Sequence, residues 1–184
     1  MGKKISFGLS SRSVRDAMKE LKKYKQDLLR KCVVFCDKLA NKGILVAEMN
    51  TGEYGRYIAF SVQTEPKRTG ARALLIATNT GHIISQWQTK EGVQEADVSP
   101  LMMAEFGSGL RANLSQNPKA AEFGMGTGTF PDQTHAEDPN GWWYMDLDGE
   151  WHHSYGSYPT MPMWNAHEEM YDQIVSTARE VFGS

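Results

Sequence analysis

Apolar residues recur every three or four positions along the first fifty residues, and this spacing predicts one long amphipathic helix over residues 10–50. Ser11 or Ser13 is expected to cap its start, and Gly43 is expected to kink it or end it before a last turn or two. An apolar face of this length has to cover a sheet or another helix. The residues that share the face are Val14, Met18, Leu21, Tyr24, Leu28, Cys32, Phe35 and Leu39.

The period of the pattern changes after residue 55. Residues 56–65, 71–79 and 82–89 are rich in β-branched and aromatic side chains and are separated by the turn signals PKRTG and NTG. This arrangement predicts an antiparallel meander over 55–90, on which the long helix packs. A shorter run at 3–9 also predicts a strand.

The rest of the chain is expected to hold a long loop, a hairpin and a last helix. The glycine-rich segment AEFGSGLRA at 104–112 is echoed by AEFGMGTGT at 121–129, which predicts an extended loop that leads into an aromatic hairpin over 104–160. Residues 162–182 return to helical spacing. The apolar stripe expected on this helix consists of Ala166, Met170, Ile174, Ala178 and Val181.

A chain of 184 residues is long enough for one hydrophobic core, so we expect a single domain. The expected fold class is α+β. A long N-terminal helix and a C-terminal helix pack on an antiparallel sheet, with a long glycine-rich loop and an aromatic β-hairpin attached. No stretch is apolar enough for a membrane span, so no membrane partner is expected.

The stretch GWWYMDLDGEWHHSYG at 141–156 predicts the hairpin itself. Asp148-Gly149 is typical of a two-residue primed turn, and this turn fixes a register in which Tyr144 faces His153 and Trp142 faces Tyr155. Because side chains alternate across the strands, His152 and His153 are expected on opposite faces. One face would carry Trp142, Tyr144, Trp151, His153 and Tyr155, and the other would carry Trp143, Met145, Leu147 and His152.

An isolated two-stranded hairpin is marginal in water, so one aromatic face is expected to cover the body of the domain. The other face is then left for a sugar, a peptide or another subunit. A metal is not expected here, because the two histidines diverge. Calcium is also excluded, since Trp151 stands where the loop after Asp146, Asp148 and Glu150 needs a glycine.

Catalysis and cofactors find little support in the sequence. No histidine pair has a metalloprotease spacing, and no serine or cysteine lies in a recognisable nucleophile context. The segment GMGTG lacks the lysine and the following helix of a phosphate loop. Cys32 and Cys36 are four residues apart on one helix face and are expected to be plain thiols. We therefore expect neither an enzyme nor a bound cofactor.

Charge is divided unevenly along the chain. Residues 1–42 contain twelve Lys and Arg against four Asp and Glu, a net of +8, whereas residues 43–184 have a net of −10. The basic segment suits non-specific contact with nucleic acid, docking on the acidic surface of a neighbouring copy, or simple exposure to solvent. Lys19, Lys22 and Lys23 are the candidate residues of this basic contact surface.

Two resemblances to known families follow from the motifs. GWWYMDLDGEW at 141–151 resembles one unit of the choline-binding type of cell-wall repeat. Such repeats stack because one hairpin cannot bury its own apolar surface, and only one copy is present here. This resemblance gives an alternative function, a cell-wall glycan-binding module that uses the aromatic hairpin.

The second resemblance covers more than half of the chain. The sequence is similar to a family of small tail-completion, or head-tail joining, proteins of tailed bacteriophages and prophages of Gram-positive bacteria. The motifs that carry it follow the basic helix and the strand meander in order. They are EFGSG at 105–109, NPKAAEFGMGTG at 117–128, GWWYMDLDGEW at 141–151, TMPMWNA at 160–166 and IVSTAREVF at 174–182.

The second resemblance implies a non-enzymatic virion protein that forms a homo-oligomeric ring and contacts other neck or tail proteins. It would be assembled in the host cytoplasm and would tolerate passing DNA without reading bases. For the subunit interface we expect Glu105, Phe106, Gly107, Trp142, Tyr144, Trp151, Tyr155 and Trp164. Phe106 and Trp164 have a second interpretation, as ordinary core residues.

Overall fold

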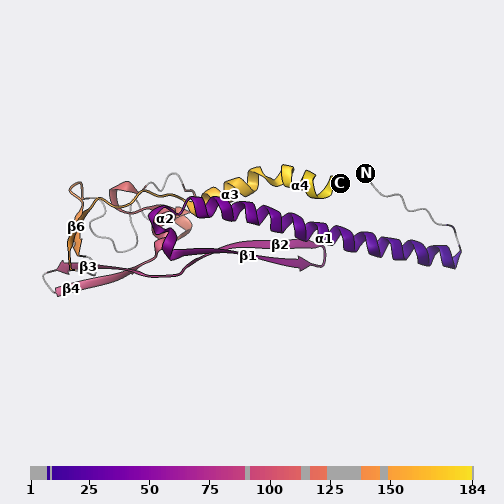
Figure 1. Ribbon diagram of the computed structural model, residues 1–184, viewed down its shortest axis with the longest axis horizontal. Helices are drawn as coiled ribbons and strands as arrows, with labels where there is room; N and C mark the ends of the chain where they lie inside the picture. The colour runs from indigo at the N-terminus through magenta and orange to yellow at the C-terminus, as the bar shows by residue number, and fades with distance from the viewer. Residues whose placement is uncertain are drawn as a thin grey trace.

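The computed structural model describes residue 8 and residues 10–89, 92–112, 117–123, 138–145 and 149–183. The fold is α+β, as the sequence predicts, and its shape is elongated (Figure 1). One helix, α1 (Ser11–Met49), forms the spine of the molecule. The predicted strand at 3–9 lies outside the described residues, apart from Gly8.

Helix α1 is continuous over 39 residues, and Gly43 neither kinks nor ends it. Its N-cap is Ser10, one residue before the expected position, and the Ser10 side chain accepts the backbone N–H of Ser13. Gly43 instead allows close packing. A Cβ atom there would lie 2.9 Å from the side chain of Met170 and 3.0 Å from Cδ1 of Leu75.

The expected three-stranded meander is wrong, because the strands belong to two separate sheets. Strands β1 (Ile58–Lys67) and β2 (Gly70–Asn79) form a two-stranded antiparallel hairpin along α1. At residues 80–82 the chain leaves this hairpin. Strand β3 (Ile83–Thr89) then pairs with β4 (Gly92–Val98), a strand that the sequence pattern did not indicate.

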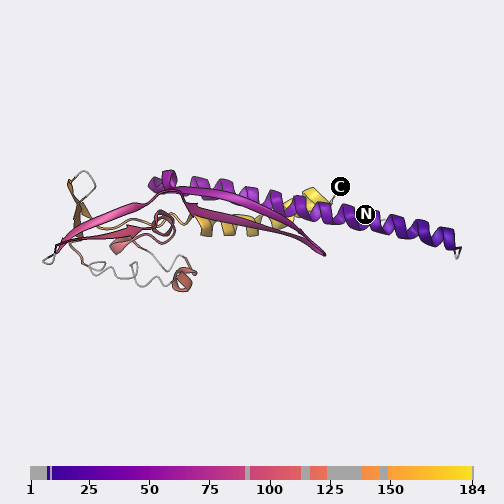
Figure 2. The ribbon, with the colours of Figure 1, turned by 90° about the horizontal axis from the view of Figure 1, so that it is seen from below.

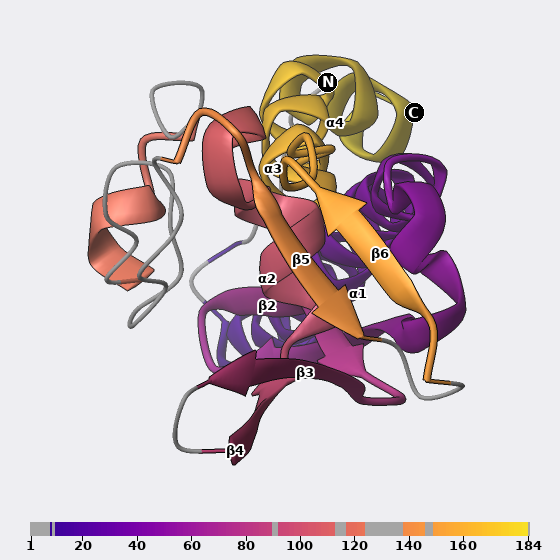
Figure 3. The ribbon, with the colours of Figure 1, turned by 90° about the vertical axis from the view of Figure 1, so that its left-hand side faces the viewer.

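The second sheet has the strand order β4-β3-β5-β6 and lies at one end of the molecule. It includes the aromatic hairpin, which consists of β5 (Trp142–Met145) and β6 (Trp151–Ser154). The backbone of β3 pairs with β5 through Gln86 and Met145. Figure 3 looks onto this end, where β5 and β6 lie in front of the helical part. The hairpin is therefore the edge of a four-stranded sheet.

Short helices connect the two sheets to the body. They are η1 (Gly52–Tyr57), α2 (Pro100–Phe106), η2 (Gly109–Arg111) and η4 (Ala120–Phe123). Residues 104–106 fall in the predicted loop, but they belong to a helix that begins with Pro100 and is capped by the Ser99 side chain. Tyr54, Ile58 and Ala104 form a core cluster where η1, β1 and α2 meet.

The C-terminal helix is confirmed and is divided at Gln173 into α3 (Pro162–Asp172) and α4 (Ile174–Phe182). Its buried side consists of Pro162, Ala166, Thr177 and Val181. Ile174, predicted for that stripe, is exposed. Helix α1 lies between the β1–β2 hairpin and α3–α4, and it runs on past the ends of both (Figures 1 and 2).

Candidate interaction surfaces

Glu105 is a buried structural residue at the start of the last helix. Its carboxylate accepts the backbone N–H of Met163 at 2.9 Å, the N–H of Trp164 at 3.0 Å and the Nδ2–H of Asn117 at 2.7 Å. These two N–H groups belong to the first turn of α3, and the N-cap residue Met161 supplies no side-chain cap. Glu105 therefore caps α3 from another helix.

The environment of Glu105 raises the pKa of its carboxyl group. Burial is the largest cause, and the three hydrogen bonds from Met163, Trp164 and Asn117 oppose it. Only 8% of Glu105 is exposed. A carboxylate held in this way offers little surface to a partner, so its contacts lie within the chain.

Phe106 and Gly107 are buried beside Glu105. The Phe106 ring packs against Phe123 with ring centroids 5.6 Å apart, which favours its interpretation as a core residue. Gly107 has a positive φ of 71°, and a Cβ atom there would meet the backbone of Ser157 and the ring of Pro159. Glu105 and Gly107 therefore hold the motif against residues 157–164, and Phe106 packs against Phe123.

The second copy of this motif has a different role. Glu122 is exposed and pairs with Lys119 at 2.7 Å, and Phe123 is exposed outside its contact with Phe106. The sequence repetition of 104–107 at 121–124 thus does not repeat the buried cap.

The hairpin register differs from the predicted one by one residue. Trp142 pairs with Ser154 and Trp143 with His153, whereas the prediction paired Trp142 with Tyr155. The pairing of Met145 with Trp151 leaves five residues between these two partners, and this odd number does not fit a two-residue turn. Of the predicted turn, Gly149 is described, with a φ of 81°, and Asp148 lies outside the described residues.

The corrected register changes the composition of both faces. Trp143, Trp151, His153 and Tyr155 share one face, and Trp142 lies on the other, because side chains of paired residues point to the same side. The ring contacts agree. His153 lies 4.8 Å from Trp143 and 4.7 Å from Tyr155, between ring centroids. His152 and His153 are adjacent on β6 and so lie on opposite faces, as predicted.

The face that covers the body is now defined. Trp142 packs over Gly109, where a Cβ atom would overlap the indole ring. The opposite face is open, with Trp143 exposed by 60% and Trp151 by 52%. We call Trp143, Trp151, His153 and Tyr155 the aromatic face. Tyr144 lies on β5 opposite His152 in the backbone pairing.

Arg111 extends the aromatic face towards the connecting loop. Its guanidinium carbon lies 5.9 Å from the ring centroid of Tyr155 and 5.2 Å from that of Tyr158. Tyr158 is itself largely exposed. Trp164, the remaining predicted interface residue, is half-buried on α3 and contacts the ring of His167.

The second exposed surface is the N-terminal half of α1, residues 11–30, which we call the α1 tip. Lys19, Lys22 and Lys23 lie on it, and all three are exposed. The apolar stripe of the helix is exposed there as well, at Val14, Met18, Leu21, Tyr24 and Leu28.

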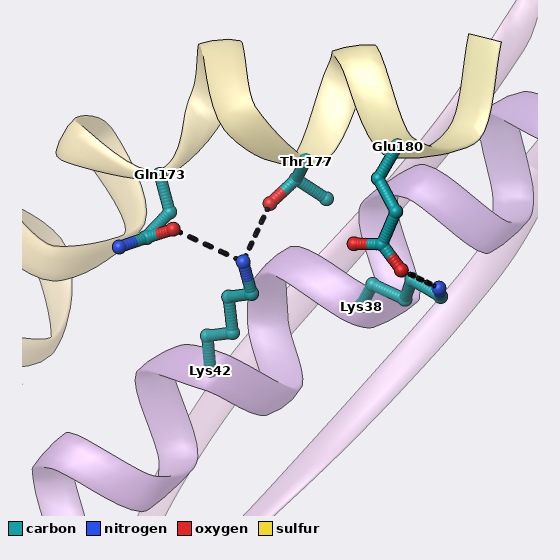
Figure 4. Close-up of polar contacts among 5 residues, drawn as sticks. All are labelled: Lys38, Lys42, Gln173, Thr177 and Glu180. Atoms are coloured by element: carbon teal, nitrogen blue, oxygen red, sulfur yellow. Dashed lines mark hydrogen bonds and ion pairs between the residues drawn. The ribbon is translucent and has the colours of Figure 1, made fainter. Parts of the chain in front are cut away.

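Further along α1 the same stripe is covered by the chain itself. Phe35 contacts Phe182 of α4 with ring centroids 5.8 Å apart, and Gly43 contacts Met170 and Leu75. Lys42 donates hydrogen bonds to Gln173 and Thr177, and Lys38 pairs with Glu180 (Figure 4). The uncovered tip is thus the continuation of a packed surface.

Cys32 and Cys36 are half-buried free thiols on α1, and burial raises the pKa of Cys36.

Over the described ranges, no group of three or more His, Cys, Asp and Glu side chains could hold a metal ion. Within the same part of the chain, no helix is long and apolar enough to cross a membrane.

Comparisons of the chain with protein-family models, with curated proteins and with solved structures give no match.

Proposed function

We propose that this chain is a structural protein of a tailed phage or prophage, which completes the tail or the head-tail junction by forming a homo-oligomeric ring. It acts without a cofactor and contacts other neck or tail proteins. It is assembled in the host cytoplasm and ends in the virion.

The observation that carries the proposal is the exposed apolar stripe of the α1 tip. Val14, Met18, Leu21 and Leu28 continue a stripe that α3 and α4 bury further along the helix. Exposed apolar surface of this extent on one side of a helix is typical of a protein–protein contact. Assembly with another copy would remove it from water.

A second observation supports several contacts for each copy. The aromatic face lies at the end of the elongated molecule opposite the α1 tip (Figures 1 and 2). Tryptophan, tyrosine and arginine are the residues that most often dominate the binding energy of interfaces. A ring subunit that also joins a second protein layer needs such distinct surfaces.

The charge pattern suits passage of DNA. The basic N-terminal segment has a net charge of +8, and any contact with phosphates would be independent of base sequence.

The motifs Glu105-Phe106-Gly107 and Pro162-Met163, which carry the family resemblance, meet in the structure through the Glu105 cap. This contact gives the two motifs a shared structural role.

The identity of the coding sequences beside this one in the genome tests the proposal directly. Coding sequences for portal, capsid and tail-tube proteins beside this one are expected. A location among metabolic genes alone would contradict the assignment.

The aromatic face also favours one rival function, a cell-wall glycan-binding module. Flat exposed rings such as Trp143 and Trp151 are able to stack on sugars. Pull-down on purified peptidoglycan and on choline resin separates the two functions. We expect no retention, and specific elution by choline or by peptidoglycan fragments would support the rival.

A further inference from the structure

We propose that the α1 tip of one copy packs antiparallel on the outer side of α3 and α4 of a second copy of this chain. The inference rests on the proposed function, because it names the contact through which copies associate. It adds both surfaces, their relative direction and the residues that meet.

The outer side of α3–α4 carries an exposed apolar stripe of its own. Tyr171 is exposed by 68% and Val175 by 58%, and Ile174 is exposed beside them. At 3.6 residues per turn these positions share one side of the helix pair. The opposite side, with Ala166, Met170 and Thr177, already faces α1 of the same chain.

The two helical surfaces match in length, and both carry exposed apolar side chains. The α1 tip spans residues 11–30, and α3 and α4 together span residues 162–182. At a rise of 1.5 Å per residue, each surface is roughly 30 Å long. Inside the chain the C-terminal half of α1 already packs on the inner side of α3 and α4.

Charge complementarity selects α3–α4 over a second α1 tip. The tip has one basic residue beside its stripe, Lys22, and one within it, Lys25, and antiparallel pairing of two tips would place these residues against one another. In contrast, residues 162–183 contain four acids and one arginine. Glu168 and Asp172 are exposed and lie beside Tyr171 on one flank of the outer stripe.

The flanks also set the direction. Helical geometry places Lys22 on one flank of the tip stripe and Lys25 within the stripe, towards the same flank, while Lys19 and Lys23 lie on the back of the helix. Only an antiparallel arrangement brings the Lys22 flank beside the Glu168 and Asp172 flank. The packing of α1 on α3–α4 within one chain is antiparallel too, since Lys38 meets Glu180 and Gly43 meets Met170.

In this arrangement Leu21 lies over Val175 of the second copy, and Val14 lies over the C-terminal end of its α4. The two surfaces are different, so the contact is heterologous and each copy can both give and receive it. Repeated contacts of this kind close into a ring or grow into a filament.

Cysteine cross-linking of purified full-length protein tests the contact. In a Cys32→Ala, Cys36→Ala background, Leu21→Cys protein is mixed with Val175→Cys protein under mild oxidation. A disulfide-linked dimer is expected from the mixture and from neither variant alone. A dimer of Leu21→Cys alone would instead show tip–tip pairing. A dimer between Leu21→Cys and Trp151→Cys proteins would show that the α1 tip binds the aromatic face instead. The absence of a dimer in every mixture would overturn the proposal.

Charge reversal supplies a second test in the unaltered cysteine background. We expect Lys22→Glu with Lys25→Glu to weaken self-association roughly tenfold, and Glu168→Lys with Asp172→Lys in the same chain to restore it. Lys19→Glu with Lys23→Glu is the matched control, with the same charge change on the back of the helix. Equal weakening by both pairs, or no rescue, contradicts the contact. The contact and the proposed function can fail separately. If the disulfide-linked dimer forms but normal particles assemble without the gene, the contact holds and the proposed function is wrong.

Discussion

The carboxylate of Glu105 accepts the backbone N–H of Trp164 at 3.0 Å, across 59 residues of sequence. This bond, with its companion to Met163, joins α2 to the first turn of α3. Because α3 and α4 cover the C-terminal half of α1, the cap positions the helix pair on which the proposed assembly surface lies.

Glu105→Gln is expected to lower the free energy of unfolding by about 1–3 kcal/mol, because an amide NH₂ group would replace one of the accepting oxygens beside a buried N–H. Urea denaturation measures the change. Glu122→Gln is the matched control in the second copy of the motif, where the carboxylate is exposed. An equal loss in both variants would contradict the capping role.

The raised pKa of Glu105 predicts a pH dependence of stability. The folded chain holds the proton more tightly than the unfolded chain, so this group's contribution to the free energy of unfolding is complete below the ordinary pKa of 4.5. It declines as the pH rises from 4.5 through the raised value. The difference in stability between the wild type and Glu105→Gln should therefore shrink over that range, and a constant difference would contradict the shift.

Gly156→Ala should be much more destabilising than Gly149→Ala. Both glycines have a positive φ, of 92° and 81°, but a Cβ at Gly156 would overlap the carbonyl oxygen of Ser108, while Gly149 is open. We expect a loss of about 2–5 kcal/mol for Gly156→Ala and about 1–2 kcal/mol for Gly149→Ala. Thermal unfolding of both variants measures this difference, and similar losses would exclude the close backbone approach.

Thr177→Val tests the contact of Lys42 with α4. Thr177 is fully buried, and its Oγ1 accepts a hydrogen bond from the Lys42 Nζ at 3.1 Å. Losing this acceptor should lower the free energy of unfolding by about 1 kcal/mol. Glu180→Gln, at the exposed pair with Lys38, should leave it unchanged within error. A larger loss of stability for Glu180→Gln than for Thr177→Val would mean that the exposed pair holds α4 in place.

The two faces of the hairpin should respond differently to substitution. Trp142→Ala removes the ring that packs over Gly109 and is expected to destabilise the fold. Trp143→Ala removes an exposed ring and is expected to leave stability unchanged while impairing assembly of particles. Denaturation and a plaque or transduction assay report the two effects, and a stable, fully active Trp142→Ala variant would contradict the assignment of faces.

Local signals predicted the helices well. The three-to-four spacing of Val14, Leu21 and Leu28 marked α1 to within a residue of its ends, since helical contacts are local in sequence. The signal for α2 was also present, as Ser99-Pro100 is a typical helix start. It was hidden by the glycines that follow.

Non-local pairing could not be predicted in the same way. Nothing in residues 82–89 shows that β3 leaves β2 to pair with β4 and β5. The signal Asp148-Gly149 favoured a tight turn, but the observed pairing of Met145 with both Gln86 and Trp151 requires a longer connection. The role of Glu105 was missed for a similar reason, because its partners are 12, 58 and 59 residues away.

Deletion of the coding sequence from the phage or prophage that carries it tests whether this protein joins heads to tails, with particles examined by electron microscopy and their proteins by mass spectrometry. We predict separate heads and tails, restored to joined particles that contain this protein when the wild-type gene is supplied in trans. Normal, infectious tailed particles without the protein would contradict it.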